Sequence, residues 1–289
     1  MIPYKNILIL IDSVHQAQVA AEKALELSDP SETCIHLVSV IQFQSVWQRI
    51  FYTKAYIQKQ RYFTKRNAIA ERKIEAIKAK IAAISPHTIV KTSIIIETAM
   101  SNQLIKYTMQ YDIDLVVNTH KSTRSGLNWF KKDWSEELAR KASVAVLTVT
   151  KGCLNHPIKS ILLPVKSFVP ERKIQVALAY AKKFNAHIHL VTLLDNNDST
   201  AKIKVDAFYL TYKILSEYGH PPQYKILQGA DSDAALLRYA DQIKADMILV
   251  NPIKKKRIPG IMRQKMTDML NPISALHILT LKPYLKRTI

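Results

Sequence analysis

The stretch VVNTHKSTRSGLNWFKKDW, at residues 116–134, joins an apolar strand end to a predicted helix through a cationic loop. Loops in this position bind phosphate in many α/β proteins, because free backbone N–H groups and the helix dipole favour anions. The residues of the loop with suitable donors or charge are Asn118, His120, Lys121, Arg124, Ser125, Gly126 and Lys132. The cations favour an anion site, whereas a single glycine argues against a glycine-rich phosphate cradle.

Two further segments concentrate positive charge. The loop IKKKRIPG, at residues 253–260, holds Lys254, Lys255, Lys256 and Arg257. The segment 45–66 mixes cations with tryptophan, tyrosine and phenylalanine, a combination that binds nucleic acid through phosphate contact and base stacking. A solvated cationic face on an amphipathic helix is the alternative. A non-specific polyanion or nucleic-acid site is therefore one hypothesis for these segments.

The bulk composition limits the classes of protein. The chain has 289 residues, a hydrophobic content of 48% and a net charge of +19, so it can bury substantial cores and attract anions. Two cysteines do not make a disulfide framework. The first apolar run is short and ends at Asp12, and no run reaches the length of a membrane span. We expect a cytoplasmic protein without a membrane segment.

The chain repeats itself in order. YKNILILIDS at 4–13 matches IKSILLPVKS at 158–167, and CIHLVSVI at 34–41 matches HIHLVTLL at 187–194. YDIDLVVNTHK at 111–121 matches IKADMILVNPIK at 243–254, and SVAVLTVTK at 143–151 matches SALHILTLK at 274–282. A repeat of this length predicts two homologous domains, at 1–150 and 158–289, with a linker at 151–157.

Each half alternates short apolar runs with helical patterns, which is typical of βαβ units around a parallel sheet. Strands are predicted at 6–11, 34–41, 89–96, 113–118, 144–150, 160–166, 187–194, 223–228, 246–251 and 275–281. Helices are predicted at 14–28, 45–84, 99–110, 133–142, 170–184, 200–218, 232–243 and 263–271. The predicted fold is α/β: two tandem doubly wound, Rossmann-like domains, each a mostly parallel five-stranded sheet with helices on both faces.

Taken together, the five strands, the acid after the first strand, the long second helix and VVNTHKSTRSGL after the fourth strand resemble the universal stress protein family, and the repeat resembles its tandem members. The resemblance implies the fold of the adenine nucleotide alpha hydrolase type. Nucleotide-binding members carry an Asp after strand one and Gly-x2-Gly-x9-Gly-Ser/Thr after strand four. Carried over, Asp12 and the backbone near Val40 would contact the adenosine.

The glycine motif itself is degraded. Asn118 and Lys121 stand where the first two glycines belong, and Lys132 and Asp133 fall at the Gly-Ser/Thr pair. A carboxylate at that helix start repels phosphate. In the second half Lys166 replaces the strand-one acid, Asn251 and Lys254 replace the glycines, and Gln264–Lys265 fall at the final pair. The usual mode of ATP binding is therefore not expected in the second half.

The resemblance and these departures predict a stress-response regulatory or binding protein that does not hold ATP by the usual glycine motif. It would act through a protein partner or an anionic small molecule. ATP binding in the first half, through Asp12 and the loop 118–133, stays open as an alternative. No nucleophile–base pair or metal-ligand set stands out, and His187 and His189 fit packed strand positions, so we expect no enzyme, with weak ATP hydrolysis left open.

Family members also suggest an assembly. In many of them the last strands pair across a dimer interface, so residues 144–150 and 275–281 would pair antiparallel within this chain. That pairing would make an intrachain pseudo-dimer and cover an exposed sheet edge. A homodimer of the whole chain is the further expectation.

Overall fold

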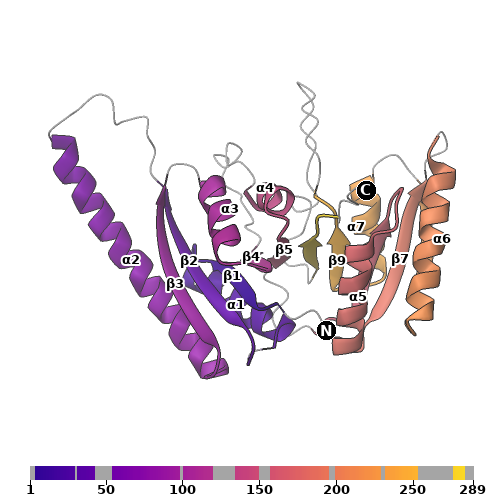
Figure 1. Ribbon diagram of the computed structural model, residues 1–289, viewed down its shortest axis with the longest axis horizontal. Helices are drawn as coiled ribbons and strands as arrows, with labels where there is room; N and C mark the ends of the chain where they lie inside the picture. The colour runs from indigo at the N-terminus through magenta and orange to yellow at the C-terminus, as the bar shows by residue number, and fades with distance from the viewer. Residues whose placement is uncertain are drawn as a thin grey trace. The chain divides into compact units, whose positions relative to one another are not determined.

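The computed structural model describes residues 4–29, 31–42, 54–97, 100–119, 134–149, 157–194, 199–228, 232–252 and 276–283. It divides into two compact units with the boundary between Val146 and Leu147, inside the strand Ala145–Val149, which is described below with the first unit. The predicted linker lies almost wholly outside the described residues, so the domain bounds stay a prediction. Both units are α/β with parallel strands, which confirms the predicted fold class (Figure 1).

The first unit is built from nine elements in chain order. They are β1 (Asn6–Leu10), α1 (Val14–Leu27), β2 (Cys34–Gln42), α2 (Lys54–Ile84), β3 (Ile89–Glu97), α3 (Met100–Gln110), β4 (Leu115–Thr119), α4 (Trp134–Lys141) and β5 (Ala145–Val149). The strand order is β3-β2-β1-β4-β5. β1 pairs in parallel with β2 on one side and β4 on the other, so the strand order reverses at β1.

The second unit repeats this plan. Its elements are β6 (Ser160–Val165), α5 (Glu171–Phe184), β7 (His187–Leu194), α6 (Ala201–Glu217), β8 (Gln223–Gln228), α7 (Ser232–Gln242), β9 (Met247–Val250) and β10 (His277–Thr280). The strand order is β10-β9-β6-β7-β8, again parallel, with β6 at the reversal. The predicted helix at 263–271 lies outside the described residues, as do residues 45–53 of the long second helix.

The central strands are buried on both faces, which explains their unbroken apolar sequences. Leu8 of β1 packs into a core with Leu104 of α3 and Leu138 of α4. Because side chains alternate along a strand, the fully buried Ile7 and Ile9 point to the opposite face, where α1 and α2 pack. Helices therefore cover both faces of this sheet, with α2 running beside β2 and β3 (Figure 1).

In the second unit the same division holds. Leu236 and Ala240 of α7 pack on Leu162, Ile248 and Ile278 at the α7 face. α5 and α6 pack against β6 and β7. α5 ends at Asn185, whose left-handed φ of 51° is a common way to stop a helix. The repeated sequence pattern therefore gives the two units the same arrangement of helices on their sheets.

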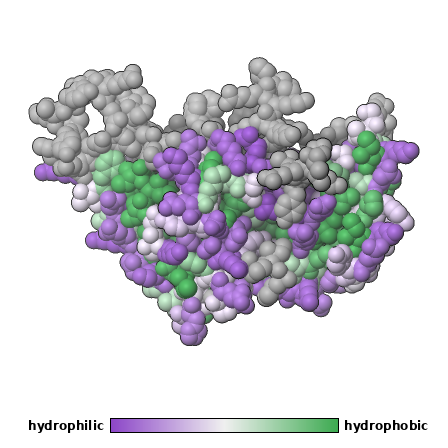
Figure 2. Space-filling model, in the orientation of Figure 1, coloured by the Kyte–Doolittle hydropathy of each residue, from purple (hydrophilic) through white to green (hydrophobic). Residues whose placement is uncertain are grey.

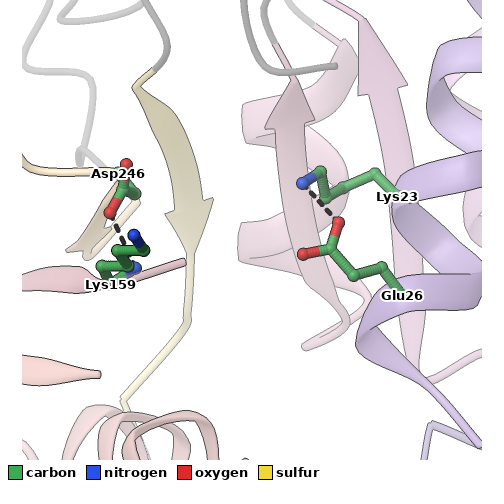
Figure 3. Close-up of polar contacts among 4 residues, drawn as sticks. All are labelled: Lys23, Glu26, Lys159 and Asp246. Atoms are coloured by element: carbon green, nitrogen blue, oxygen red, sulfur yellow. Dashed lines mark hydrogen bonds and ion pairs between the residues drawn. The ribbon is translucent and has the colours of Figure 1, made fainter. Parts of the chain in front are cut away.

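One aspartate in each unit fastens the amino edge of the sheet. Asp114 Oδ2 accepts hydrogen bonds from the backbone N–H groups of Lys5 and Asn6, at 2.9 and 3.0 Å. Asp246 Oδ2 accepts from those of Lys159 and Ser160, at 2.7 and 2.9 Å (Figure 3). These bonds tie the start of strand four to the start of strand one. The repeat is thus reproduced at the level of single hydrogen bonds.

Not all apolar side chains are buried. In the second unit the edge strand β8 and helix α6 expose a group of large hydrophobic residues, and Figure 2 shows hydrophobic residues gathered on the α6 side. They are Ile203, Val205, Tyr209, Leu210, Tyr224 and Ile226. In the part of the chain that the structure describes, no helix is both long and apolar enough to cross a bilayer. The cytoplasmic location stays a prediction.

Candidate functional site

The carboxyl edge of the first unit brings together three of the predicted site residues. β1 ends at Leu10, the N–H of Ile11 still donates to the carbonyl of Val38, and the exposed Asp12 follows. Leu10 is opposite Val38 in the parallel register, so Val40 lies at the level of Asp12. Asn118 lies near the end of β4, on the other side of β1. Ligands of doubly wound sheets bind at such a reversal point.

Each of these residues has a distinct environment. Asp12 is exposed, whereas Val40 and Asn118 are half-buried. Val40 packs against the core formed with α3 and α4. Directly after Asp12, Ser13 begins α1, and its hydroxyl oxygen accepts from the N–H of Gln16 at 3.3 Å. The N-terminus of α1 therefore opens beside the candidate site, where it favours an anion.

A lysine from the long second helix also reaches this edge. Lys73 of α2 donates from Nζ to the backbone carbonyl oxygen of Asp12, at 2.6 Å. In the described residues, no carboxylate lies within ion-pair distance of this ammonium. The first unit thus has a cation from α2 beside the strand-one acid, a contribution that the sequence reasoning missed.

The other predicted residues cannot be placed. Those of the first loop, His120, Lys121, Arg124, Ser125, Gly126 and Lys132, lie outside the described residues. So do Lys254, Lys255, Lys256 and Arg257 of the second basic loop. The structure therefore brings together the strand-end part of the predicted site and leaves the loop part as a prediction.

The second unit has a different chemistry at the same edge. Lys166, exposed, stands where the first unit has Asp12. Lys173, in the first turn of α5, is buried and donates from Nζ to the carbonyl oxygens of Pro164 at 2.5 Å and Leu249 at 3.4 Å. Pro164 and Leu249 lie at the ends of β6 and β9, the two strands that flank the reversal point. An ammonium group is therefore hydrogen-bonded to both strands near their carboxyl ends, the edge at which ligands of this fold bind.

Burial explains the protonation behaviour of this lysine. Removal from water, with a smaller contribution from the charge of Lys166, lowers the pKa of Lys173 to about 7. The two carbonyl oxygens accept hydrogen bonds from the protonated form, but they carry only partial charge and do not replace a carboxylate partner. Lys173 is therefore a cation held at considerable cost inside the second unit.

Other side chains cap the remaining strand ends of the second unit. Thr192 donates from Oγ1 to the carbonyl of Val165 at 3.1 Å, and Lys204 of α6 donates to that of Leu193 at 3.2 Å. Arg172 donates to the carbonyl of Lys282 at 3.2 Å. Four side chains thus satisfy the backbone acceptors along this edge from within the unit. Three of the four, Arg172, Lys173 and Lys204, are cationic.

Two histidines at equivalent strand positions of the repeat, His36 in β2 and His189 in β7, are buried. His36 is fully buried, and its Nδ1 lies 3.1 Å from the hydroxyl oxygen of Tyr107. Burial lowers the pKa of His36 to about 4, with Lys91 adding to the effect, and burial raises the pKa of Tyr107 to about 12. Burial likewise lowers the pKa of His189 and raises that of Tyr239. The His36–Tyr107 pair is therefore a neutral packing group at ordinary pH.

The histidines of β7 behave as the sequence predicts in part. His189 is buried in the strand, which confirms a packed position, whereas His187 is exposed. Among the described residues, no group of three or more His, Cys, Asp or Glu side chains is arranged to hold a metal ion.

Sequence signals existed for three of the missed residues. Lys173 stands one turn before Ala177 and two turns before Tyr180, both buried, so it occupies a core-facing position of α5. Asp114 and Asp246 align in the repeat, each directly before strand four. For Lys73 no sequence signal exists, because its reach to Asp12 depends on how α2 packs.

Comparisons with known proteins agree with this architecture. The model of the family described as "Universal stress protein family" matches residues 3–150. A universal stress protein from Archaeoglobus fulgidus DSM 4304 has a similar structure, with a TM-score of 0.68 at 13% identity over 97% of both chains. A putative universal stress protein from Pseudomonas aeruginosa UCBPP-PA14 gives a TM-score of 0.59 at 15% identity, over 98% of this chain and 94% of its own.

A third structure extends the range of proteins with this fold. The cytoplasmic domain of a prokaryotic cation chloride cotransporter gives a TM-score of 0.53 at 10% identity, over 96% of this chain and 95% of its own. At such identities the likeness shows the fold alone. The comparison with curated proteins found no match.

Proposed function

This chain belongs to the universal stress protein family, and we propose that it is a regulatory binding protein of the stress response that does not hold ATP by the usual glycine motif. It acts through a protein partner or an anionic small molecule. The observation that carries this proposal is the Lys173 ammonium between the ends of β6 and β9, together with Lys166 in place of the strand-one acid.

In the second unit a nucleotide and the Lys173 ammonium would compete for the carboxyl ends of β6 and β9. A nucleotide at the reversal point would have to displace the Lys173 ammonium from the carbonyls of Pro164 and Leu249. A buried donor and its acceptors left unsatisfied cost roughly 1–3 kcal/mol each. Lys166 also offers no carboxylate to accept the hydrogen bonds of a ribose or base. The second unit is therefore proposed to act as scaffold or partner surface.

In the first unit Asn118 lies at the end of β4, where the motif has glycine. Non-glycine residues in a left-handed loop cost roughly 1–2 kcal/mol each, and a lost charge-assisted hydrogen bond costs roughly 1.5–3 kcal/mol. Two such losses remove several decades of affinity, at about 1.4 kcal/mol per decade. These costs support the proposal that the usual glycine-based mode is absent here too.

Thermal unfolding with and without ATP and Mg²⁺, at low and moderate salt, tests the proposal. A ligand at 100 times its dissociation constant would add roughly 2.7 kcal/mol of stability. We expect no shift in midpoint for the wild type. A shift that survives moderate salt and disappears in Asp12→Ala, but not in the control Asp206→Ala on α6, would contradict the proposal.

A second candidate function is binding of an adenine nucleotide or another anionic small molecule by the first unit. It is favoured by one observation, the Lys73 ammonium 2.6 Å from the Asp12 carbonyl oxygen, beside Val40 and Asn118. On this hypothesis Lys73→Met weakens binding as much as Asp12→Ala does. The ligand would saturate at one molecule per chain, because only the first unit keeps the acid.

Other parts of the expected function stand as proposals. We propose no enzymatic activity, and a colorimetric phosphate-release assay with ATP tests for weak hydrolysis. The intrachain pseudo-dimer through 144–150 and 275–281, a homodimer of whole chains and a separate protein partner are also proposed. Light scattering at several protein concentrations distinguishes a monomer from a homodimer.

A further inference from the structure

Helix α2 carries an unusual excess of positive charge. Its 31 residues, Lys54–Ile84, include nine lysines and arginines and two glutamates. At 100° per residue, Arg61, Lys65 and Arg72 fall on one lane of the helix, and all three are exposed. This lane lies about 180° from the buried lane of Ala70, Ile74, Ile77 and Ile81 that packs on the sheet. The cations therefore point away from the first unit.

These cations have no acidic partners. In the described residues, Arg61, Lys65 and Arg72 form no ion pair or hydrogen bond, whereas Lys23, Lys141 and Lys213 on other helices each pair with a glutamate (Figure 3 shows Lys23 with Glu26). Of the two glutamates of α2, Glu75 lies 4.0 Å from Lys78. The positive charge of this lane is thus available to an external anion.

An aromatic side chain adjoins the cationic lane. Tyr62 is 41% exposed, and the guanidinium carbon of Arg66 lies 5.3 Å from its ring centroid. Phe63 supports the Tyr62 ring edge-on, with centroids 5.7 Å apart. The Arg66 guanidinium covers one face of the ring, so the exposed remainder of the ring is the part that can stack on a nucleic-acid base.

We propose that the α2 basic face, made of Arg61, Lys65 and Arg72 with Tyr62 beside them, binds a single-stranded nucleic acid. The cations contact the phosphates, and the Tyr62 ring stacks on a base. From Arg61 to Arg72 the helix advances about 16 Å, which matches about five nucleotides at a rise of 3.4 Å. This role is independent of the proposed function at the carboxyl edge of the sheet.

Charge and surface chemistry favour this occupant over two others. A membrane-binding helix needs a broad free apolar face, but the apolar face of α2 is packed on the sheet. A second copy meeting this face with its own copy of the same face would bring three like-charged side chains against Arg61, Lys65 and Arg72. A strand of phosphates satisfies the unpaired cations and uses the exposed ring.

Fluorescence anisotropy with a labelled oligothymidylate, measured over a range of salt concentrations, tests the proposal. The variant is the triple substitution Arg61→Gln, Lys65→Gln and Arg72→Gln. Each phosphate contact on a single strand contributes about −0.7 to the slope of log K against log salt. We expect the triple variant to make the slope less negative by about 2 and to weaken binding about 100-fold at roughly 0.1 M salt.

A matched control removes the same charge elsewhere. Lys182, Lys202 and Lys225 are exposed on α5, α6 and β8, and their triple substitution by glutamine should leave binding within a few-fold of wild type. Equal weakening by both triple variants would show general charge attraction and overturn the proposal. So would an absence of wild-type binding, or binding to anionic vesicles without binding to the oligonucleotide. Unchanged thermal midpoints establish that the variants fold.

Substitutions of Tyr62 test whether its ring stacks on a base. Tyr62→Ala should weaken binding about tenfold without changing the salt slope, because it removes a base contact and no charge. Tyr62→Phe, which keeps the ring, should restore the affinity. If Tyr62→Phe binds as weakly as Tyr62→Ala, the ring does not stack on a base and that part of the proposal is wrong.

Discussion

The ammonium nitrogen of Lys173 lies 2.5 Å from the carbonyl oxygen of Pro164, in the first turn of a helix and out of contact with water. In the first unit the carbonyl of Asp12 is also bonded by a lysine, but Lys73 reaches it from the outer helix and stays partly exposed. In both units a lysine therefore donates a hydrogen bond to a backbone carbonyl near the strand ends at the reversal point. The two lysines differ in burial.

Replacing the buried lysine should stabilise the protein in a pH-dependent way. The folded-state pKa of Lys173, about 7, lies below its ordinary value of 10.5, so between these values the unfolded chain binds more protons. Wild-type stability should therefore rise as pH increases from about 7 towards 10. Lys173→Met should add roughly 1–4 kcal/mol at pH 6, the scale for apolar replacement of buried charges, and less at pH 9.

Urea unfolding at both pH values measures this effect. Lys182→Met on the same helix, where the lysine is exposed, is the control and should change stability little. A Lys173→Met variant that is less stable than wild type at pH 6 would show that the bonds to Pro164 and Leu249 outweigh the cost of burying the charge.

The aspartates at the amino edge should each contribute to stability. Asp114→Ala removes both acceptor bonds to Lys5 and Asn6, and Asp246→Ala removes those to Lys159 and Ser160. Each substitution should cost roughly 1–3 kcal/mol in urea unfolding. Because the pairs belong to different units, the double variant should be additive within about 0.5 kcal/mol. Asp206→Ala, an exposed acid on α6, is the control; an equal loss there would refute a specific role.

The helix that opens at the candidate site depends on its cap. Ser13→Ala should cost about 1 kcal/mol, because the N–H of Gln16 loses the hydroxyl acceptor. Ser13→Asp should retain most of the stability, since a carboxylate also accepts from this N–H. Thermal unfolding compares the three proteins, and equal midpoints for Ser13→Ala and wild type would count against the cap.

The buried histidine of β2 should stay neutral well into the acid range. Its folded-state pKa of about 4 lies below the ordinary value of 6.5, so the unfolded chain binds more protons between these values. This histidine should therefore make the fold less stable as pH falls from about 6.5 to 4. Ring-proton NMR of His36 gives its midpoint directly, and titration above pH 6 would contradict a buried neutral ring.

Most of the fold could be predicted because its signals are local and repeated. The apolar run at β1 and its copy at β6 predict central parallel strands, and the structure places both there. The family resemblance predicted that Asp12 and the backbone near Val40 belong to one site, and the register of β1 and β2 in the structure places them at the same level. The family and the fold are therefore confirmed.

The chemistry of the site was less predictable because it depends on long side chains crossing between elements. Lys73 bonds Asp12 across 61 residues of sequence, and Lys173 bonds Leu249 across 76. No local pattern encodes such reach. The loop cations, from His120 to Lys132, stay a prediction because they lie outside the described residues.

Asp114 and Asp246 hold the amino ends of the strands, whereas ligands of this fold bind at the carboxyl ends. The residues that stabilise each sheet and the residues that could bind a ligand thus lie at opposite ends of the strands. After a gene duplication, one copy can exchange its strand-one acid for Lys166 and bury Lys173 beside the strand ends. The hydrogen bonds that Asp246 accepts at the opposite edge still hold its strands together. Divergence of this kind lets selection specialise one copy as a receptor and retain the other as its structural companion.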